Sequence, residues 1–413
     1  MIPKAHPRLI TVARVIDHMG MGGIQRSIHS YLHHHNRTKF RVLLLRLQEK
    51  PTWEAWRDDP LIQQSVLLPV RHARDTKGIR RLAAFLREQS VDVLHSHGPF
   101  PNTIARQAAM LAGTPVVLPQ YHSTYENRFD AEKLAWERVL WPYSSRALMV
   151  STAALDAWRA HTGIRDDRQS VVWVPINLDA VEESSHRPTE RLLEQINSFH
   201  PEWPLLCSAS RLYEHKRIDE MIRSIGLLRD RRRDVRLFIA GDGPEENHLC
   251  ALVEEVGVQD RVLMLGTIPD VPALLARSQA SLLASDEEGF SQLNIEAMHC
   301  GVPVISTPVG VVASIDPRGE YVYVIPNSAA HHLAEAIERV LDHAPDRQQR
   351  IAQGKQMAQQ FDAAQWSRNI ESLYEQELER GFLKQNRPWG YGNKLSAMRF
   401  LRDRIQWRLL RRK

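Results

Sequence analysis

The stretch EGFSQLNIEAMHCGVP, residues 288–303, combines two carboxylates with the start and stop signals of a short helix. Glu288 and Glu296 are separated by seven residues. Ser291 is expected to cap the helix N-terminus, Gly301 to take the left-handed position after the last turn, and Pro303 to prevent continuation. The free backbone N–H groups of such a helix carry partial positive charge, so they favour an anionic ligand beside Glu288.

The spacing of the two carboxylates suits a nucleotide sugar. The helical rise between them amounts to roughly 12 Å, which is about the span from a sugar across a diphosphate to a ribose. Glu288 can therefore bind hydroxyls at one end of the ligand and Glu296 at the other. Gly289, Phe290 and Ser291 form the intervening turn, and we expect them to line the same site.

Short apolar runs alternate with helical patterns along most of the chain. Repetition of strand, helix and strand predicts parallel sheets with helices on both faces. A chain of 413 residues with 43% hydrophobic content is too long for one ordinary core and fits two doubly wound domains. The predicted strands are LITVARV (9–15), RVLLLRL (41–47), DVLHSH (92–97), TPVVLPQ (114–120), RALMVS (146–151), SVVWVP (170–175), PLLCSAS (204–210), VRLFIAG (235–241), RVLMLG (261–266), ASLLAS (280–285) and PVIST (303–307).

Several motifs directly follow these predicted strands. Ligands of open α/β sheets bind at the carboxyl ends of the strands, so the motifs are expected to meet at one edge of each sheet. In chain order they are GMGG (20–23), HSHG (95–98), GTPVVLPQYHS (113–123), SASRLYEHKR (208–217), IAGDGPE (239–245) and the stretch at 288–303.

Taken in this order, the motifs resemble family 4 of the retaining glycosyltransferases, whose signature is E-x7-E, over most of residues 9–380. The resemblance implies the α/β GT-B fold, in which two Rossmann-like domains face each other across a cleft. The weak apolar pattern at 181–204 predicts a linker between an acceptor-side domain (1–180) and a nucleotide-sugar domain (205–360). These are followed by a crossover helix like that of the family (361–383) and a basic helical tail (384–413). The sequence shows no strand-end D-x-D, the motif with which metal-dependent transferases of the other common fold hold a cation, so we expect metal-independent catalysis.

The resemblance assigns the diphosphate of the donor to two cations, Arg211 and Lys216. Negative charge accumulates on the diphosphate as its bond to the sugar breaks, and fixed cations stabilise that state. The alternative is that both side chains belong to a solvated face. By the same resemblance, Glu296 binds the ribose and Glu288 the transferred sugar. Ser291 and Gln292 replace the small pair usual after Phe290, which leaves the sugar's identity open.

Glycines are expected to bring the backbone close to the ligand at two loops. Gly22 and Gly23 precede an amphipathic pattern and can approach a phosphate at a helix start. Gly241 and Gly243 resemble the family's loop on the nucleotide side. Both pairs can also be read as ordinary glycine turns.

His122 in QYHST matches a histidine that the family places beside the transferred sugar. A neutral imidazole can accept a sugar hydroxyl, whereas a protonated one can balance phosphate charge; the alternative is a structural histidine. One of His95 and His97 is expected to face the core.

The histidines at 29, 33, 34 and 35 resemble metal ligands because two of them are one helical turn apart. No acidic or cysteine cluster is evident beside them in the sequence, and a polar helix end explains them equally well. We therefore expect no metal site.

Composition predicts a cytoplasmic protein, either soluble or peripheral on a membrane. Cys207, Cys250 and Cys300 cannot all pair and form no C-x-x-C motif. No apolar run approaches the ~20 residues of a membrane span, and the opening MIPKAHPRL lacks the apolar region of a secretory signal.

The positive charge of the chain is concentrated at its end. Residues 384–413 carry ten Lys or Arg against one Asp, so the rest of the chain is acidic and no nucleic-acid binding is expected.

The tail continues beyond the usual end of the family. Leu395, Met398, Leu401, Ile405 and Leu409 recur at helical spacing among arginines, which predicts a basic amphipathic helix for the anionic inner face of a membrane. The alternative is a helix packed on the protein or on a second copy.

The predicted function is retaining transfer of a sugar from a nucleoside-diphosphate sugar to a hydroxyl of a glycan or lipid-linked glycan. UDP is favoured over GDP, and no cofactor is expected beyond the donor substrate. Two alternatives remain open: a nucleotide-sugar epimerase of the same fold, and an inactive relative that serves as an assembly subunit.

Overall fold

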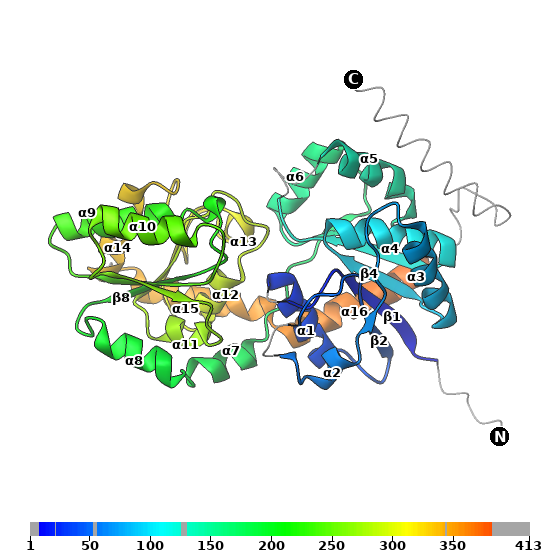
Figure 1. Cartoon of the computed structure of the whole chain (residues 1–413), viewed down its shortest axis with the longest axis horizontal. Coiled ribbons are helices and arrows are strands. Elements are labelled where there is room, and N and C mark those ends of the chain that lie inside the picture. Colours follow the sequence, from blue (N-terminus) through cyan, green and yellow to red (C-terminus); the bar gives the residue numbers. More distant parts are fainter. Residues whose placement is uncertain (1–7, 21, 53–55, 125–129, 343–344, 382–413) are drawn as a thin grey trace. The chain divides into compact units, whose positions relative to one another are not determined.

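In the computed structural model, the chain forms two compact units, each built around one parallel sheet (Figure 1). The structure describes residues 8–20, 22–52, 56–124, 130–342 and 345–381. Unit 1 comprises residues 1–175 and 363–413, and unit 2 comprises residues 176–362. In the described ranges, no helix combines the length and the apolar character that crossing a bilayer demands.

The sheet of unit 1 has seven parallel strands in the order β3-β2-β1-β4-β5-β6-β7. Its strands are β1 Ile10–Ile16, β2 Phe40–Arg46, β3 Val66–Leu67, β4 Val93–His97, β5 Val116–Tyr121, β6 Ala147–Met149 and β7 Gln169–Val171. Its helices are α1 Gly23–His34, α2 Pro60–Gln63, α3 Thr76–Glu88, α4 Pro99–Ala112, α5 Ala131–Leu140, η2 Trp141–Tyr143, α6 Thr152–Thr162 and α16 Ala363–Arg380. One core cluster joins the sheet to α3 and α4, and a second joins it to α1 and α16.

The sheet of unit 2 has six parallel strands in the order β10-β9-β8-β11-β12-β13. Its strands are β8 Leu205–Ala209, β9 Arg236–Ala240, β10 Val262–Gly266, β11 Ala280–Leu283, β12 Val304–Ser306 and β13 Tyr323–Val324. Its helices are α7 Leu178–Ser185, α8 Glu190–Ser198, η3 Glu214–Lys216, α9 Ile218–Asp230, α10 Glu246–Val256, α11 Val271–Ala276, α12 Gln292–His299, α13 Gly310–Ile315, α14 Ala330–Leu341, α15 Arg347–Ala358 and η4 Gln359–Phe361.

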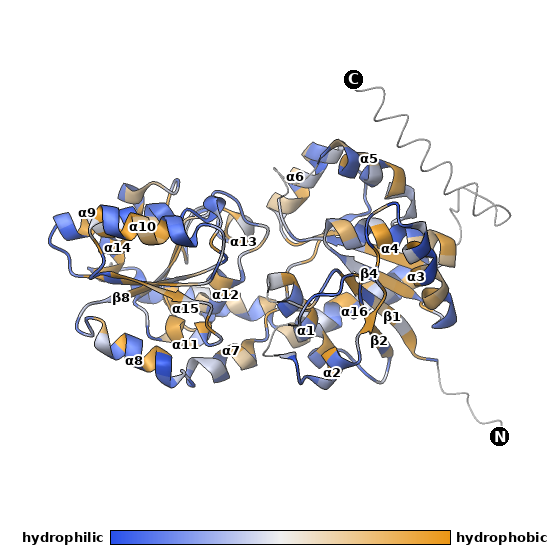
Figure 2. Ribbon diagram, in the orientation of Figure 1, coloured by the Kyte–Doolittle hydropathy of each residue, from blue (hydrophilic) through white to orange (hydrophobic). Residues whose placement is uncertain are grey.

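Helices cover both faces of the sheet in unit 2. Figure 1 shows α9 and α10 on one face and α8 and α11 on the other. The buried core on the α9 face draws side chains from α9, α10, α14 and the strands. Figure 2 shows hydrophilic and hydrophobic residues alternating along α8. Its apolar residues Leu192 and Ile196 are buried. The amphipathic pattern thus fits a helix that covers a sheet.

The predicted doubly wound architecture is confirmed, with differences at the sheet edges. Every predicted strand is present, whereas the two-residue edge strands β3 and β13 were not foreseen. Residues 181–204, expected as a linker, carry most of α7 and all of α8 and belong to unit 2. The units instead divide at 175/176 and 362/363, and α16 belongs to unit 1. The basic tail at 384–413 lies outside the described residues.

Candidate active site

Most of the predicted site residues follow strands at the point where the strand order of each sheet reverses. In unit 1 this point lies between β1 and β4, and in unit 2 it lies between β8 and β11. Loops at such a point diverge to opposite faces and leave room for a ligand at the carboxyl ends of the strands. Arg211 and Lys216 follow β8, Glu288 follows β11, and Gly22 and Gly23 follow β1.

Lys216 and Glu288 form an ion pair in unit 2. Lys216 Nζ lies 2.6 Å from Glu288 Oε1, and the two side chains are 15% and 11% exposed. The hydroxyl of Ser285 donates to the same carboxylate oxygen at 2.8 Å. A backbone hydrogen bond of 2.8 Å from Asp286 N to His215 O joins the same two loops. The structure therefore holds one cation and one carboxylate together, partly removed from water.

Arg211 pairs with Asp242 instead, in the loop after β9. Arg211 Nη1 lies 2.5 Å from Asp242 Oδ1, and both side chains are about half exposed. Thr267 donates to the other oxygen of Asp242 at 2.7 Å. The guanidinium is thus oriented by a carboxylate while much of its surface stays accessible.

Gly241 and Gly243 bring the loop after β9 against the loop after β8. A Cβ atom on Gly241 would lie 1.8 Å from the carbonyl oxygen of Ser210, and one on Gly243 would lie 2.3 Å from that of Leu212. Leu212 N also donates to Asp242 O at 2.8 Å. These glycines are required by backbone packing between the two loops, whatever contact they make with a ligand.

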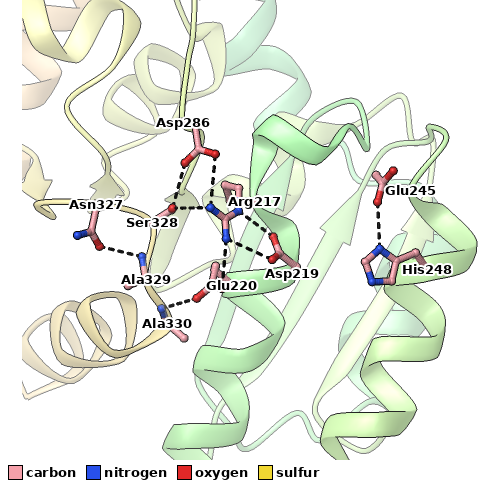
Figure 3. Close-up of polar contacts among 10 residues, drawn as sticks. All are labelled: Arg217, Asp219, Glu220, Glu245, His248, Asp286, Asn327, Ser328, Ala329 and Ala330. Carbon is pink, nitrogen blue, oxygen red and sulfur yellow. Dashed lines mark hydrogen bonds and ion pairs between the residues drawn. The ribbon is translucent and has the colours of Figure 1, made fainter.

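Arg217, directly after Lys216, joins three segments of unit 2 (Figure 3). Its guanidinium contacts Asp219 and Glu220 on α9 at 3.2 Å, and Asp286 at 3.4 Å. It also donates to the hydroxyl of Ser328, which in turn donates to Asp286. This contact network supports the loop that carries Lys216 and the one that carries Glu288.

The backbone of Arg217 is left-handed, with φ 51° and ψ 40°. A residue with a Cβ atom pays for this conformation, which glycine adopts freely. The contacts of the Arg217 side chain offset that cost. Sequence reasoning missed this residue, since a lone arginine beside a lysine gives no signal.

Helix α12 ends as predicted but begins differently. Gly301 is left-handed with φ 73° and follows the last turn. Ser291 holds the N-cap position with φ 76° and makes no side-chain cap, so the predicted capping role is wrong. A serine caps from extended backbone, which this conformation excludes. Its hydroxyl is buried without a hydrogen-bond partner among the described residues.

The other predicted site residues of this stretch, Gly289, Phe290 and Glu296, are buried. Glu296, in the middle of α12, is 1% exposed. Phe290 is buried, and its carbonyl accepts from Val311 N at 2.8 Å. A Cβ atom on Gly310 would lie 2.8 Å from Cβ of Glu288, so α13 packs closely on the turn that contains Gly289. The carboxylates predicted to share a ligand are both shielded, Glu296 more than Glu288.

His122 lies at the end of a line of imidazoles in unit 1. Its Nε2 is 3.1 Å from Nδ1 of His97, whose ring stacks on that of His95 with centroids 4.4 Å apart. His95 and His97 are both buried, whereas the sequence predicts that one of them faces the core. Burial, together with the charge of Arg14, lowers the pKa of His122 to about 3. The imidazole is therefore neutral near pH 7.

A buried network holds this line in place. Arg14 donates to the hydroxyl of Tyr374 at 2.9 Å, and that hydroxyl lies 2.7 Å from Nδ1 of His95. Nε2 of His95 lies 3.1 Å from Oε1 of Gln120. Burial and the charge of Arg14 keep the pKa of His95 well below its usual value. A neutral His95 then donates to Gln120 and accepts from Tyr374.

The glycine loop after β1 leads into α1. Gly22 is the N-cap in extended conformation, and α1 starts at Gly23. His18 accepts from Gly20 N at 3.0 Å and thereby shapes the turn. The loop therefore lies at a helix start, as its sequence predicts.

The grounds for expecting no metal near His29 and His33 were wrong. Asp59, the N-cap of α2, lies beside both imidazoles and completes a group of three ligands. Its carboxylate comes from a loop 26 residues beyond His33, so no local pattern reveals it. His34 and His35 instead hydrogen-bond to backbone carbonyls of their own helix.

Comparison with known proteins places this architecture in a family. The model of "Glycosyltransferase Family 4" matches residues 21–180, and that of "Glycosyl transferases group 1" matches residues 190–357. Among solved structures, Anabaena Alr3699/HepE in complex with UDP and glucose superposes with a TM-score of 0.76. The superposition covers 89% of this chain and all of that one at 16% identity, which shows a shared fold.

Two curated relatives match over shorter segments. N-acetyl-alpha-D-glucosaminyl L-malate synthase of Bacillus anthracis is 35% identical over 29% of this chain. The gpi3 subunit of the Schizosaccharomyces pombe phosphatidylinositol N-acetylglucosaminyltransferase is 34% identical over 39% of it. This chain spans only 31% and 36% of the lengths of these two relatives. With both family models matched in order on two Rossmann-like units, the chain belongs to family 4 of the glycosyltransferases and has the GT-B fold.

Proposed function

We propose that the protein transfers a sugar from a nucleoside-diphosphate sugar to a hydroxyl of a glycan, with retention at the anomeric carbon. The observation that carries the proposal is the ion pair of Lys216 and Glu288 at the switch point of unit 2. An ammonium held by a carboxylate, and the guanidinium of Arg211 after the same strand, suit a diphosphate next to sugar hydroxyls.

Each of these residues has a distinct role in the reaction. Lys216 and Arg211 stabilise charge on the departing diphosphate, and Glu288 binds hydroxyls of the transferred sugar. Glu296 is assigned to the ribose. Because Glu296 is buried, the ribose must approach α12 closely. His122 is neutral near pH 7, so it acts as a hydrogen-bond partner of the sugar and not as a countercharge.

The acceptor hydroxyl approaches the face that the diphosphate leaves, and a departing phosphate oxygen takes its proton. This route requires no protein nucleophile or base and no metal ion. It relies on orientation of the two substrates and on fixed positive charge.

UDP is the proposed nucleotide and N-acetylglucosamine the first sugar to test. The Anabaena structure contains UDP and glucose, and both curated relatives are named for N-acetylglucosaminyl groups. The acceptor is proposed to be lipid-linked, because one relative is named for phosphatidylinositol and the tail of this chain is basic and amphipathic.

A thermal-shift screen with UDP-, GDP- and ADP-sugars tests the donor. We expect UDP-sugars to raise the melting temperature of the full chain and to do so less in Lys216→Ala. Product analysis by NMR then reports the anomeric configuration of the new bond. Donor conversion without a glycan product would instead identify an epimerase, and no shift with any nucleotide sugar would contradict the proposal.

Vesicle flotation tests the membrane part of the proposal. The full chain is expected to float with anionic liposomes and to remain in solution with zwitterionic ones, whereas a chain truncated after residue 383 does not float. Equal flotation of both chains would exclude the tail as the anchor, and absence of flotation of the full chain would contradict the membrane part of the proposal.

A further inference from the structure

Three metal-ligating side chains converge in unit 1, between α1 and α2. Nε2 of His29 and Nε2 of His33 lie 2.8 and 2.7 Å from Oδ2 of Asp59. The three ligand atoms all lie within 4.8 Å of one another. Over the ranges that the structure describes, no other group of three His, Cys, Asp or Glu side chains converges in this way.

The surrounding contacts orient each of these groups. His29 and His33 are one turn apart, so their rings project from the same face of α1. The ring of His29 stacks on Trp56, with centroids 4.8 Å apart and planes 10° from parallel. Asp59 accepts from Leu61 N through Oδ1 at 2.8 Å, which directs Oδ2 toward the imidazoles.

The donor set identifies the class of ion. Two imidazoles and one carboxylate suit Zn²⁺, Co²⁺ or Ni²⁺, whereas Mg²⁺ and Ca²⁺ prefer oxygen ligands only. In a tetrahedral site, adjacent ligand atoms lie roughly 3.3 Å apart. The imidazoles would therefore move away from Asp59 by about 0.5 Å each, a shift that small side-chain rotations provide. His33 is 40% exposed, which gives the ion access.

We propose that His29, His33 and Asp59 bind one divalent transition-metal ion through Nε2, Nε2 and Oδ2. Three protein ligands leave the fourth position of a tetrahedral ion for water or another small ligand. The bound ion links α1 to the N-terminus of α2. The site is separate from the residues assigned to sugar transfer, and the proposal does not depend on that function.

Titration with Co²⁺ tests the site directly. The full chain, without a histidine tag and stripped by a chelator, is titrated while the visible absorption of tetrahedral Co²⁺ is recorded. We expect one equivalent to bind and Zn²⁺ to displace it. The same protein should melt at a higher temperature with Zn²⁺ than with chelator.

Matched variants locate the ion. Asp59→Asn keeps an oxygen that accepts from Leu61 N, so the cap of α2 is retained while the anionic ligand is lost. His33→Gln removes one imidazole from the exposed side. Each should weaken Co²⁺ binding by at least about tenfold. His34→Gln is the control, because His34 lies on the same helix but faces the carbonyl oxygen of Ser30 at 2.7 Å.

The outcomes separate a metal site from hydrogen bonding alone. Loss of binding in Asp59→Asn and His33→Gln, with unchanged binding in His34→Gln and unchanged circular dichroism in all three, supports the proposal. Absence of saturable Co²⁺ binding in the parent chain would overturn it and leave a carboxylate that accepts from two imidazoles. Equal affinity in the parent and both ligand variants would overturn it as well.

Discussion

The ammonium of Lys216 lies 2.6 Å from Oε1 of Glu288, although the two residues are 72 positions apart. The pair joins the loop after β8 to the loop after β11 at the strand-order reversal of unit 2. Because both side chains are largely shielded from water, each holds the other in a fixed position. An arriving diphosphate would thus meet a cation that is already oriented.

Lys216→Ala and Glu288→Ala are each expected to lower turnover by at least ~100-fold, a loss of about 2.7 kcal/mol in transition-state stabilisation. The physical reason is that the fixed charge beside the leaving diphosphate is removed or displaced. Turnover is measured with saturating donor and acceptor. Arg231→Ala is the control, since Arg231 forms an exposed pair with Glu338 in the same unit. A rate within about threefold of the parent, a difference of about 0.6 kcal/mol, would refute the role of the residue changed.

Gly243→Ala is expected to lower the free energy of unfolding by about 2–4 kcal/mol, because its methyl group would overlap the backbone of Leu212. Gly266→Ala is the matched control in unit 2. Gly266 has φ 67° but no atom within 4 Å of the added Cβ, so only the conformational cost of about 1 kcal/mol applies. Denaturant titration measures both. Equal losses of unfolding free energy in the two variants would show that the loops after β8 and β9 can move apart without a cost in stability.

Arg217→Ala and Arg217→Gly distinguish the stability cost of the left-handed backbone at Arg217 from the stability that its side-chain contacts provide. Both variants lose the contacts to Asp219, Glu220 and Asp286, and both should melt below the parent. Glycine relieves the left-handed strain, so Arg217→Gly should be more stable than Arg217→Ala by about 1 kcal/mol. Thermal unfolding of the three proteins provides the comparison. A glycine variant no more stable than the alanine variant would show that this conformation carries no cost.

The histidine line makes stability fall in acid. The pKa of His122 is lowered to about 3, and those of His95 and His97 are also lowered, in each case first by burial and then by the charge of Arg14. In the unfolded chain these groups take up protons near pH 6.5, whereas the folded chain resists protonation. The contribution of these neutral histidines to the free energy of unfolding is therefore complete above pH 6.5 and is lost as the pH falls toward 3.

Each such histidine adds a slope of about 1.4 kcal/mol per pH unit below pH 6.5. Urea titrations at pH 7.5, 6.5 and 5.5 should therefore show a loss of stability that is smaller in His122→Gln than in the parent. His161→Gln serves as the control, since this histidine lies near the end of α6. An identical pH dependence in the parent and His122→Gln would contradict the assignment.

The sequence predicts the strands because long apolar runs such as those of β1 and β8 have no alternative to burial. It does not predict β3 or β13, since two-residue edge strands carry no periodic pattern. The motifs after the strands place Lys216 and Glu288, but only the folded chain shows that they pair. Asp59 was missed for the same reason, because its imidazole partners are distant in sequence. The predicted capping role of Ser291 was wrong because the residue type alone does not reveal the backbone φ at that position.

The membership of α16 in unit 1 has a consequence for synthesis on the ribosome. Tyr374 on α16 donates and accepts in the network of Arg14, a residue made 360 positions earlier. Unit 2, by contrast, is one continuous segment of the chain. We expect the nascent chain to complete unit 2 first, while the guanidinium of Arg14 lacks its hydrogen bond to Tyr374 until α16 emerges from the exit tunnel.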